Sequence, residues 1–340
     1  MSFPQSGFQM VILILVLWIL NCQPTGRDST PTPQPVKFEL RLKSGDPSKQ
    51  NRGLLAEHYP ASNERRIDLF WKVIDSLGGV YLGVGTDQNL SFAARAKSEY
   101  VILMDFDPEI VKVNRVHIHF LKNSENYPEF KKRWERKNKS DSLEFLKTSS
   151  PDEFEDLKIG LEIGFKPGIG VPERLSELDY MNKKFGLQTF SHRAEDYSYL
   201  RKLALENRIF AIHGDLTGSN VIQELSEILR KENLTINLMY TSNAEEYFRF
   251  PEGFRKNIKS LPISERSILI RTITAGAKSY GFPEGEKFPD NFPFHYNFQK
   301  ISNLKKWMDY PKDFNIPFLL GRRTDLERGF SEIQKEPPEM

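Results

Sequence analysis

The sequence predicts an α/β protein with a doubly wound, mostly parallel β-sheet. Five short segments are apolar at almost every position, and segments with helical periodicity alternate with them. A strand without a polar face is typical of a parallel sheet that helices cover on both sides, because neither face of the strand meets water. The five predicted strands are residues 80–85, 100–105, 208–213, 235–241 and 267–273.

Helices are predicted where apolar residues recur every three or four positions. The clearest example is residues 64–77, which precede the first strand. Two further helices follow the first and third strands, over residues 90–97 and 219–231. We expect Ser219 and Asn220 to cap the second of these, with Glu224 in its first turns.

A long segment, residues 108–207, separates the second and third strands, and one crossover helix needs far less. It predicts a largely helical insertion with a Gly- and Pro-rich loop over residues 159–174. Such an insertion often forms a lid over the carboxyl edge of the sheet, where ligands bind in open α/β folds. The alternative is a surface addition that takes no part in binding. The predicted helical segments are residues 127–146, 151–157, 174–186 and 195–207.

An apolar run over residues 11–20 ends shortly before Cys22. The run is too short to span a bilayer comfortably, but it matches the hydrophobic region of a secretory signal. A cysteine at this place resembles the lipidation site of bacterial lipoproteins, and the preceding Ile19-Leu20-Asn21 resembles the looser signals of spirochaetes. The alternative is an uncleaved membrane anchor in which Cys22 has no role.

These patterns divide the chain into four parts. They are a signal peptide (1–21), a lipidated Pro/Thr-rich linker (22–36), an α/β domain (37–330) and a disordered tail (331–340). We therefore expect an exported lipoprotein that its lipid anchor holds at a membrane. The formal net charge of +2 argues against a nucleic-acid partner, and a single cysteine excludes both a disulfide framework and a cysteine zinc site.

The predicted strands end in glycines and polar residues that suit a ligand site. Gly83 and Gly85 follow the first strand and permit a tight turn close to a ligand. Asp105 ends the second strand, at the separation from Gly83 at which an acid accepts hydrogen bonds from ribose hydroxyls. Asp215 and Asn243 follow the third and fourth strands at the same edge. The alternative is that these residues only cap helices and the sheet edge, which requires the same residue types.

This arrangement resembles the class I S-adenosylmethionine-dependent methyltransferase fold, which is of Rossmann type. The resemblance covers roughly residues 64–107 and 208–308. The sequence VYLGVGT at residues 80–86 is similar to the first motif of that family, and VILMDFDPE at residues 101–109 to its second strand. By the same resemblance, a further pair of strands near the C-terminus, which includes residues 292–301, is expected to complete the sheet.

The resemblance implies a cofactor, S-adenosylmethionine, and a role for individual residues. Asp105 would hold the ribose, Asp215 the adenine amino group, and Asn243 would lie near the reacting methyl group. Gly83 and Gly85 would approach the cofactor closely, and Asp87, which replaces the third glycine of the motif, would lie beside the methionine moiety. No metal is expected, and the sequence designates no catalytic residue.

Two functions follow from this reading. The first is a membrane-anchored binding or interaction protein with a nucleotide-type pocket, which predicts an exposed groove. The second is an active methyltransferase on a small-molecule or peptide acceptor, which predicts a pocket that residues 108–207 close. His213 is a candidate base, although we expect the backbone to satisfy it. His117 and His119 alternate as metal ligands do, but lack a third ligand.

Overall fold

The computed structural model describes residues 38–46, 59–275, 280–286 and 293–339. Contacts divide the chain into Met1–Phe38 and Glu39–Met340, and the second unit contains every element described below. The predicted signal peptide, Cys22 and the linker up to residue 36 lie outside the described residues. Within the described ranges, no helix combines the length and the apolar character needed to cross a membrane.

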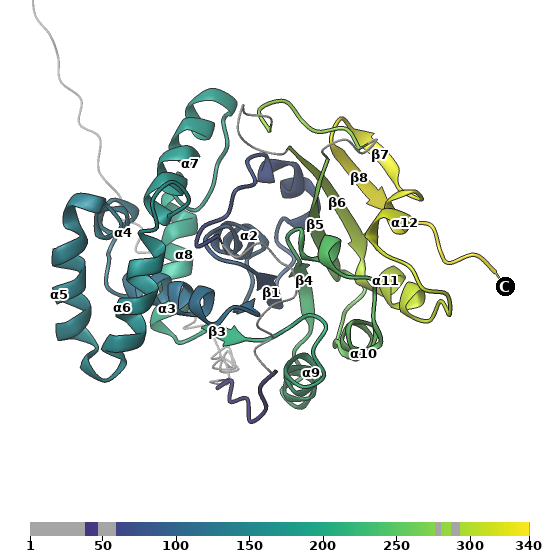
Figure 1. The fold of residues 1–340 in the computed structure, drawn as a ribbon, viewed down its shortest axis with the longest axis horizontal. Helices are drawn as coiled ribbons and strands as arrows, with labels where there is room; N and C mark the ends of the chain where they lie inside the picture. Colours follow the sequence, from purple (N-terminus) through teal and green to yellow (C-terminus); the bar gives the residue numbers. More distant parts are fainter. Residues whose placement is uncertain (1–37, 47–58, 276–279, 287–292, 340) are drawn as a thin grey trace, which may run out of the picture. The chain divides into compact units, whose positions relative to one another are not determined.

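An eight-stranded mixed sheet organises the second unit, in the order β3-β2-β1-β4-β5-β6-β8-β7 (Figure 1). Strands β1 to β5 are parallel to one another, β6 is antiparallel to β5, and β8 runs parallel to β6. The predicted α/β class with a mostly parallel sheet is therefore confirmed. The strands are β1 Val80–Val84, β2 Tyr100–Asp105, β3 Ile209–His213, β4 Ile236–Tyr240, β5 Ile268–Thr274, β6 Phe294–Lys300, β7 Thr324–Glu327 and β8 Phe330–Ile333.

The order of the first five strands creates a switch point between β1 and β4. From β1 the chain adds β2 and β3 on one side, then returns to add β4 and β5 on the other. Loops that leave β1 and β4 consequently diverge, which opens a crevice at their carboxyl ends. Helices α2 (Gln88–Ala96) and α8 (Ala194–Leu205) cover one face, and α9 (Val221–Lys231), α10 (Glu252–Ser260) and α11 (Ile301–Met308) cover the other (Figure 1).

The helix predicted over residues 64–77 is shorter than expected. It consists of a 3₁₀ turn, Ile67–Phe70, followed by α1, Trp71–Ile74. The predicted cap of α9 is also wrong, because the Asn220 side chain donates to the carbonyl of Gly45 at 3.0 Å. The carboxylate of Asp46 instead accepts the Asn220 amide at 3.1 Å, from a segment far away in the sequence.

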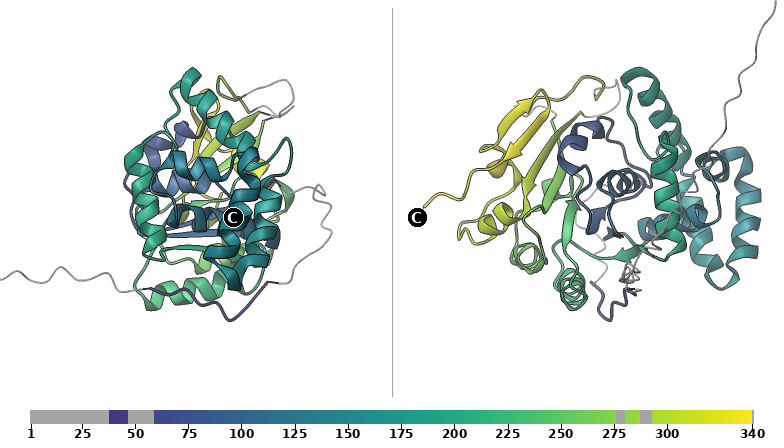
Figure 2. Two further views of the ribbon diagram at one scale, coloured as in Figure 1. Left: turned by 90° about the vertical axis from the view of Figure 1, so that its left-hand side faces the viewer. Right: turned by 180° about the vertical axis from the view of Figure 1, so that it is seen from behind.

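Residues 108–207 form six α-helices. Those within residues 127–164 lie beyond the β3 end of the sheet, whereas those within residues 171–205 lie beside α2 (Figures 1 and 2). The first, α3, begins immediately after β2, with the Asp107 side chain accepting the Glu109 amide at 2.9 Å and Pro108 in the first turn. Such an N-cap and N-terminal proline are typical of a helix start. The helices are α3 Pro108–Lys122, α4 Tyr127–Arg133, α5 Lys139–Ser149, α6 Phe154–Gly164, α7 Val171–Phe185 and α8.

The glycine-rich stretch predicted as a loop is partly helical. Gly160 and Gly164 lie in α6. A Cβ at Gly160 would be 2.4 Å from the Lys112 carbonyl oxygen in α3, and one at Gly164 would be 2.5 Å from the Trp134 ring. These glycines therefore allow close packing between helices and do not mark a turn. Only the residues between Gly164 and Val171 are non-helical.

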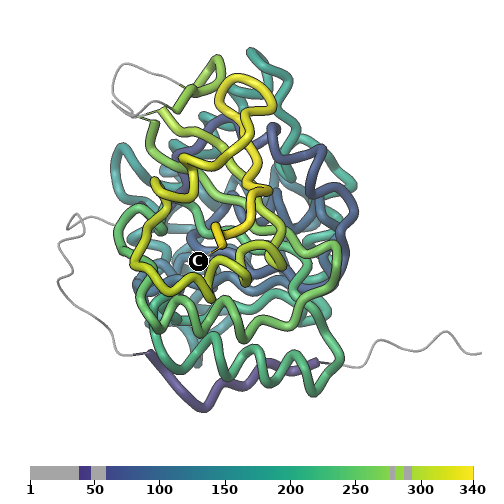
Figure 3. Tube along the Cα trace, turned by 90° about the vertical axis from the view of Figure 1, so that its right-hand side faces the viewer, coloured from purple at the N-terminus to yellow at the C-terminus, as the bar shows by residue number. Residues whose placement is uncertain are grey.

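The C-terminal residues complete the sheet. Strand β6 falls within the expected residues 292–301, and β7 and β8 extend the sheet beyond it (Figure 3). The tail predicted to be disordered from residue 331 is thus wrong at its start, because Phe330–Ile333 pairs with β6. The indole nitrogen of Trp307 also donates to the Lys335 carbonyl at 2.9 Å, which holds the chain past the last strand.

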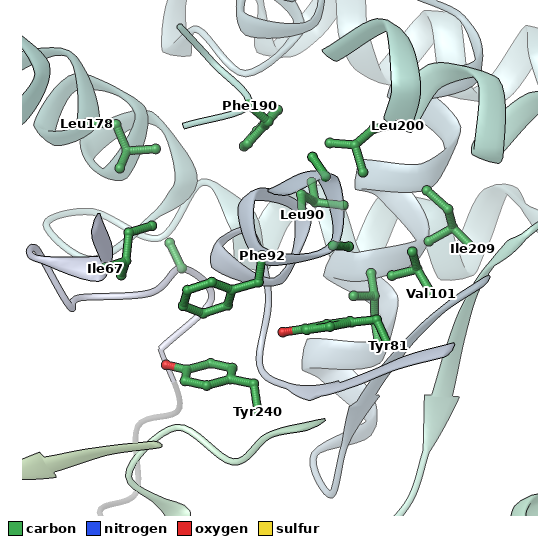
Figure 4. Packing of buried hydrophobic residues seen from close by; sticks show 14 of the residues in the cluster. Ile67, Tyr81, Leu90, Phe92, Val101, Leu178, Phe190, Leu200, Ile209 and Tyr240 are labelled. Carbon is green, nitrogen blue, oxygen red and sulfur yellow. The ribbon is translucent and has the colours of Figure 1, made fainter. Parts of the chain in front are cut away.

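One continuous apolar core joins the helices of residues 108–207 to the sheet. Tyr81 of β1, Phe92 of α2 and Tyr240 of β4 lie together under α2, and Phe92 and Tyr240 pack edge to face with ring centroids 4.9 Å apart (Figure 4). Leu178 of α7 and Leu200 of α8 belong to the same cluster. The floor of the crevice is therefore rigid, because tightly packed interiors have few voids to yield into.

Candidate functional site

A cavity of about 230 Å³ lies at the carboxyl ends of β1 to β4, at the switch point of the sheet. Open α/β sheets bind ligands in this position. The segment before the first helix forms one wall, and the loops after the four strands form the rest. The lining residues fall within residues 59–64, 84–86, 105–110, 214–216 and 240–248.

Four of the six residues predicted to bind a cofactor line this cavity: Gly85, Asp105, Asp215 and Asn243. Asp105 at the end of β2 pairs in register with His213 at the end of β3. Asp215 follows His213 by two residues, so the two acids lie at the ends of adjacent strands. The Asp105 carboxylate accepts the Asp107 amide at 2.9 Å, and Asp215 accepts both the amide and the hydroxyl of Thr217 at 2.8 Å. Local turns thus orient both carboxylates. That they bind a cofactor remains a prediction.

The other two predicted residues, Gly83 and Asp87, do not line the cavity. A Cβ at Gly83 would be 2.0 Å from Oδ1 of Asn89, so the glycine makes room for a side chain of α2. The Asp87 carboxylate is buried, where it accepts the Ser62 amide at 2.8 Å and pairs with Arg174 at 3.2 Å. Packing against Asn89 explains the glycine at position 83, and the ion pair with Arg174 explains the acid at position 87, so neither residue requires a ligand.

Arg174 of α7 connects the helices of residues 108–207 to the site, a contact that no pattern in the sequence indicates. Its Nη2 donates to Oε1 of Gln88 at 2.9 Å, and its Nη1 donates to Glu177 at 2.8 Å. Burial opposes the charge of Arg174, but Asp87 and Glu177 outweigh it and raise the pKa of the guanidinium. The side chain therefore remains a cation inside the protein.

A chain of hydrogen bonds runs from Arg174 to the cavity. Gln88, which accepts from Arg174, donates through Nε2 to the Tyr240 hydroxyl at 2.7 Å. Tyr240 in turn donates to Oε1 of Glu64 at 2.6 Å. Burial, with the Glu64 carboxylate second, raises the pKa of Tyr240 well above its ordinary value, so the phenol stays protonated and donates.

Glu64 is a cavity-lining residue that sequence reasoning missed. Its side chain is buried although it lines the cavity. In addition to Tyr240, the hydroxyls of Ser242 and Thr272 donate to the same oxygen, Oε1, at 2.9 and 3.0 Å. The only sequence signal was its place at the start of a helical pattern, which gives no indication of contacts with β4 and β5.

The charge of the cavity is one-sided. Three carboxylates, those of Glu64, Asp105 and Asp215, belong to its lining. Among the described residues that line it there is no lysine, arginine or histidine. Carboxylates attract positive charge and hydrogen-bond donors and repel phosphates.

Comparison with known proteins places the chain. Residues 59–334 match the model of a family described as "Domain of unknown function (DUF7790)". The chain belongs to this family. Every cavity-lining residue lies within the matched range.

A structural comparison finds similarity to an rRNA methyltransferase, aviRa from Streptomyces viridochromogenes, at 12% sequence identity. The match covers 67% of this chain and 80% of the other, with a TM-score of 0.27, and at that score it supports no conclusion. No curated protein matches the sequence.

The DUF7790 domain has three histidines that the sequence raised as candidates. His213 does not line the cavity, and its Nε2 lies 3.0 Å from the Phe106 carbonyl, so the expectation of a backbone partner is confirmed. His117 is packed against Phe130 and Trp134, and burial lowers its pKa to about 4. His119 lies 2.8 Å from the Ser149 hydroxyl. In the described part of the chain, no three His, Cys, Asp or Glu residues are grouped to hold a metal.

The predicted lid is not seen at this cavity of the domain. Of residues 108–207, only Ile110 contributes to the lining. The cover comes instead from residues 59–64, before the first strand, and from residues 243–248, after the fourth. Residues 108–207 contact the site indirectly, through the bonds of Arg174 to Asp87 and Gln88.

Glu286 holds the segment that carries Glu64. Its Oε2 accepts the Tyr296 hydroxyl at 2.7 Å and the Arg66 amide at 3.2 Å. Burial raises the pKa of Glu286 to about 7, and the negative charge of Glu64 adds to the rise. The folded domain therefore binds a proton here more tightly than the unfolded chain does.

This shift predicts a pH dependence of stability. The folded pKa lies above the ordinary value of 4.5, so the stabilisation is complete below that value and is lost as the pH rises towards about 7. Glu286→Gln keeps an acceptor oxygen but cannot titrate. In the wild type, the free energy of unfolding should fall as the pH rises through this range. We expect this fall to be smaller in the variant by on the order of 2–3 kcal/mol.

Urea denaturation between about pH 4.5 and pH 8 measures the effect. Glu227→Gln is the matched control, because Glu227 is exposed on α9 and should leave the pH profile unchanged. Equal slopes in wild type and Glu286→Gln would show that Glu286 does not titrate in this range.

Proposed function

We propose that this domain binds a phosphate-free, positively charged nucleoside, of which S-adenosylmethionine is the best-fitting example. The observation that carries the proposal is the cavity lining, which contains three carboxylates and, among the described residues, no cation. A sulfonium or ammonium group gains from such a lining, since opposite charges attract strongly where water is excluded.

The same lining argues against nucleotide cofactors that carry phosphates. Dinucleotide and triphosphate sites place phosphates on glycine-rich turns and helix N-termini, usually with basic residues. Here the N-cap position of α2 is occupied by the acidic residue Asp87, and the nearest turn keeps only Gly83 and Gly85 of the usual glycines. A pyrophosphate would meet the carboxylates of Glu64, Asp105 or Asp215, and none of the described lining residues carries a positive charge.

The position of the carboxylates suggests how the ligand lies. Asp105 and Asp215 follow the neighbouring strands β2 and β3, which suits the ribose hydroxyls and the amino group of an adenine. The rest of the ligand would then extend across β1 towards β4. Since residues 108–207 leave the cavity open except at Ile110, the geometry favours a binding module over a pocket that a lid closes.

Methyl transfer is the second candidate function, and the rim of the cavity favours it. Tyr59 and Tyr247 line the cavity but are 50% and 54% exposed, which is unusual for large aromatic side chains in this structure. Two exposed rings beside a methyl donor would provide a stacking surface for a planar acceptor. Catalysis would then rest on positioning, because the described cavity lining contains no histidine or lysine as a base.

We also propose that the chain is an exported lipoprotein, anchored at a membrane through Cys22. The support is the apolar run over residues 11–20, its end shortly before the single cysteine, and the Pro/Thr-rich residues that follow. A linker of that composition is semi-extended and packs poorly, so it would hold the domain away from the lipid surface.

Ligand binding is tested by calorimetric titration of the full chain in detergent. We expect S-adenosylmethionine and S-adenosylhomocysteine to bind, and ATP and NAD not to bind, because of the negative lining. Asp105→Ala should weaken binding by about 10- to 100-fold through loss of charge-assisted hydrogen bonds. Asp141→Ala, an exposed change on α5, is the control. Failure of the folded wild type to bind either adenosyl compound would refute the proposal.

Methyl transfer is tested with radiolabelled S-adenosylmethionine and a panel of phenols, indoles and nucleosides. If one class is methylated, Tyr247→Ala should lower the rate by about tenfold while leaving the affinity for S-adenosylhomocysteine unchanged. Tyr180→Ala removes an exposed tyrosine that does not line the cavity and should have no effect. Ligand binding without methyl transfer to any acceptor would refute the methyltransferase function and support binding as the only function of the cavity.

Anchoring is tested by Cys22→Ser. A lipidated chain should incorporate labelled palmitate, and the variant should lose both the label and processing at that site. If the variant remains in the membrane fraction with the wild-type mass and the wild type carries no lipid, the apolar run is an uncleaved anchor instead.

A further inference from the structure

Glu64 differs from the other two carboxylates of the cavity in how it is held. It comes from the segment before the first strand, whereas Asp105 and Asp215 follow strands. Its Oε1 accepts three hydroxyl groups, from Tyr240, Ser242 and Thr272. None of the hydrogen bonds in the described part of the chain reaches Oε2.

Glu64 forms no direct ion pair with any described residue. Its charge helps to raise the pKa of the nearby Arg174, but the guanidinium pairs directly with Asp87 and Glu177. The Glu64 residue is only 2% exposed, yet it lines the cavity. A buried carboxylate without a cation is costly, and a positive group of a ligand would relieve that cost.

The three hydroxyls also fix the direction of the carboxylate. Tyr240 and Ser242 belong to the end of β4 and the loop after it, and Thr272 lies in β5. With Oε1 held on the sheet side by these donors, Oε2 is the oxygen left for a cavity ligand. The carboxylate is thus preorganised, so that a ligand need not pay for orienting it.

The separation between Asp105 and Glu64 along the edge of the sheet suits a nucleoside with a tail. Asp105 and Asp215 follow β2 and β3, and Glu64 is bound to β4 and β5. Adjacent strands lie about 4.8 Å apart, so the two to three spacings from Asp105, after β2, to Glu64, bound to β4 and β5, correspond to roughly 10–14 Å. A nucleoside at β2 and β3 would therefore direct its tail towards Glu64.

We propose that Glu64 is the residue that binds the positively charged tail of the ligand, through Oε2, and so selects cationic adenosyl compounds over neutral ones. This inference rests on the proposed function and assigns it a specificity-determining residue. The cation is either an ammonium or a sulfonium group, which share this chemistry and are separated by the choice of ligands.

The experiment is a calorimetric titration of the full chain and Glu64→Gln with three compounds. S-adenosylmethionine carries both cations, S-adenosylhomocysteine carries only the ammonium, and methylthioadenosine carries neither and is uncharged. We expect Glu64→Gln to weaken binding of the two compounds that carry a cationic group by about 10- to 100-fold and to leave binding of methylthioadenosine within about twofold. A loss for both cationic compounds identifies the ammonium, and a loss for S-adenosylmethionine alone identifies the sulfonium.

Retained binding of methylthioadenosine shows at the same time that Glu64→Gln is folded. Glu64→Asp, which keeps the charge, should recover part of the selectivity, and Glu227→Gln on the exposed face of α9 should change nothing. Equal weakening of all three compounds, or of none, would overturn the role of Glu64. If the folded wild type binds none of the three, it is the proposed function itself that fails.

Discussion

The buried ion pair between Asp87 and Arg174 is the contact on which the site depends. It joins the first turn after β1 to α7, a helix of the long segment between β2 and β3. Removing one partner of a buried pair typically costs about 3–5 kcal/mol, because the other charge is left uncompensated. Hydrogen bonds through Gln88 and Tyr240 connect the same contact to Glu64, so α7 is linked to a cavity that it does not line.

The sequence predicted the parts of this fold that follow from local periodicity. Strands β1 to β5 are apolar at nearly every position, and the acids after β2 and β3 could be placed at one edge because parallel strands end together. Contacts across long sequence separations left no such signal. Asp46 caps α9 from 174 residues away, and Glu64 meets Tyr240 across 176. Nothing in the local pattern of either acid indicates its partner.

The turn after β1 shows why a sequence motif alone does not identify cofactor-binding residues. Gly83 and Asp87 have the residue types of a cofactor loop, yet here the glycine accommodates Asn89 and the acid neutralises Arg174. Gly85, midway between Gly83 and Asp87, does line the cavity, and its φ of 94° is a conformation that favours glycine. The same short stretch thus contains residues that serve packing and one that lines the candidate ligand site. Which role each residue has depends on its contacts with α2 and α7, which the motif does not reveal.

The charge of the cavity and the cellular address of the chain are separate questions. S-adenosylmethionine belongs to the cytosol, whereas the N-terminal pattern predicts export. The proposed ligand, however, is defined by its chemistry and not by a compartment: in the proposal, Asp105 and Asp215 bind a nucleoside and Glu64 binds a positive tail, and no described lining residue supplies a positive charge for a phosphate. An exported protein with this cavity would accept any nucleoside cation that reaches it. The chemistry of the site can therefore be established independently of where the chain is anchored.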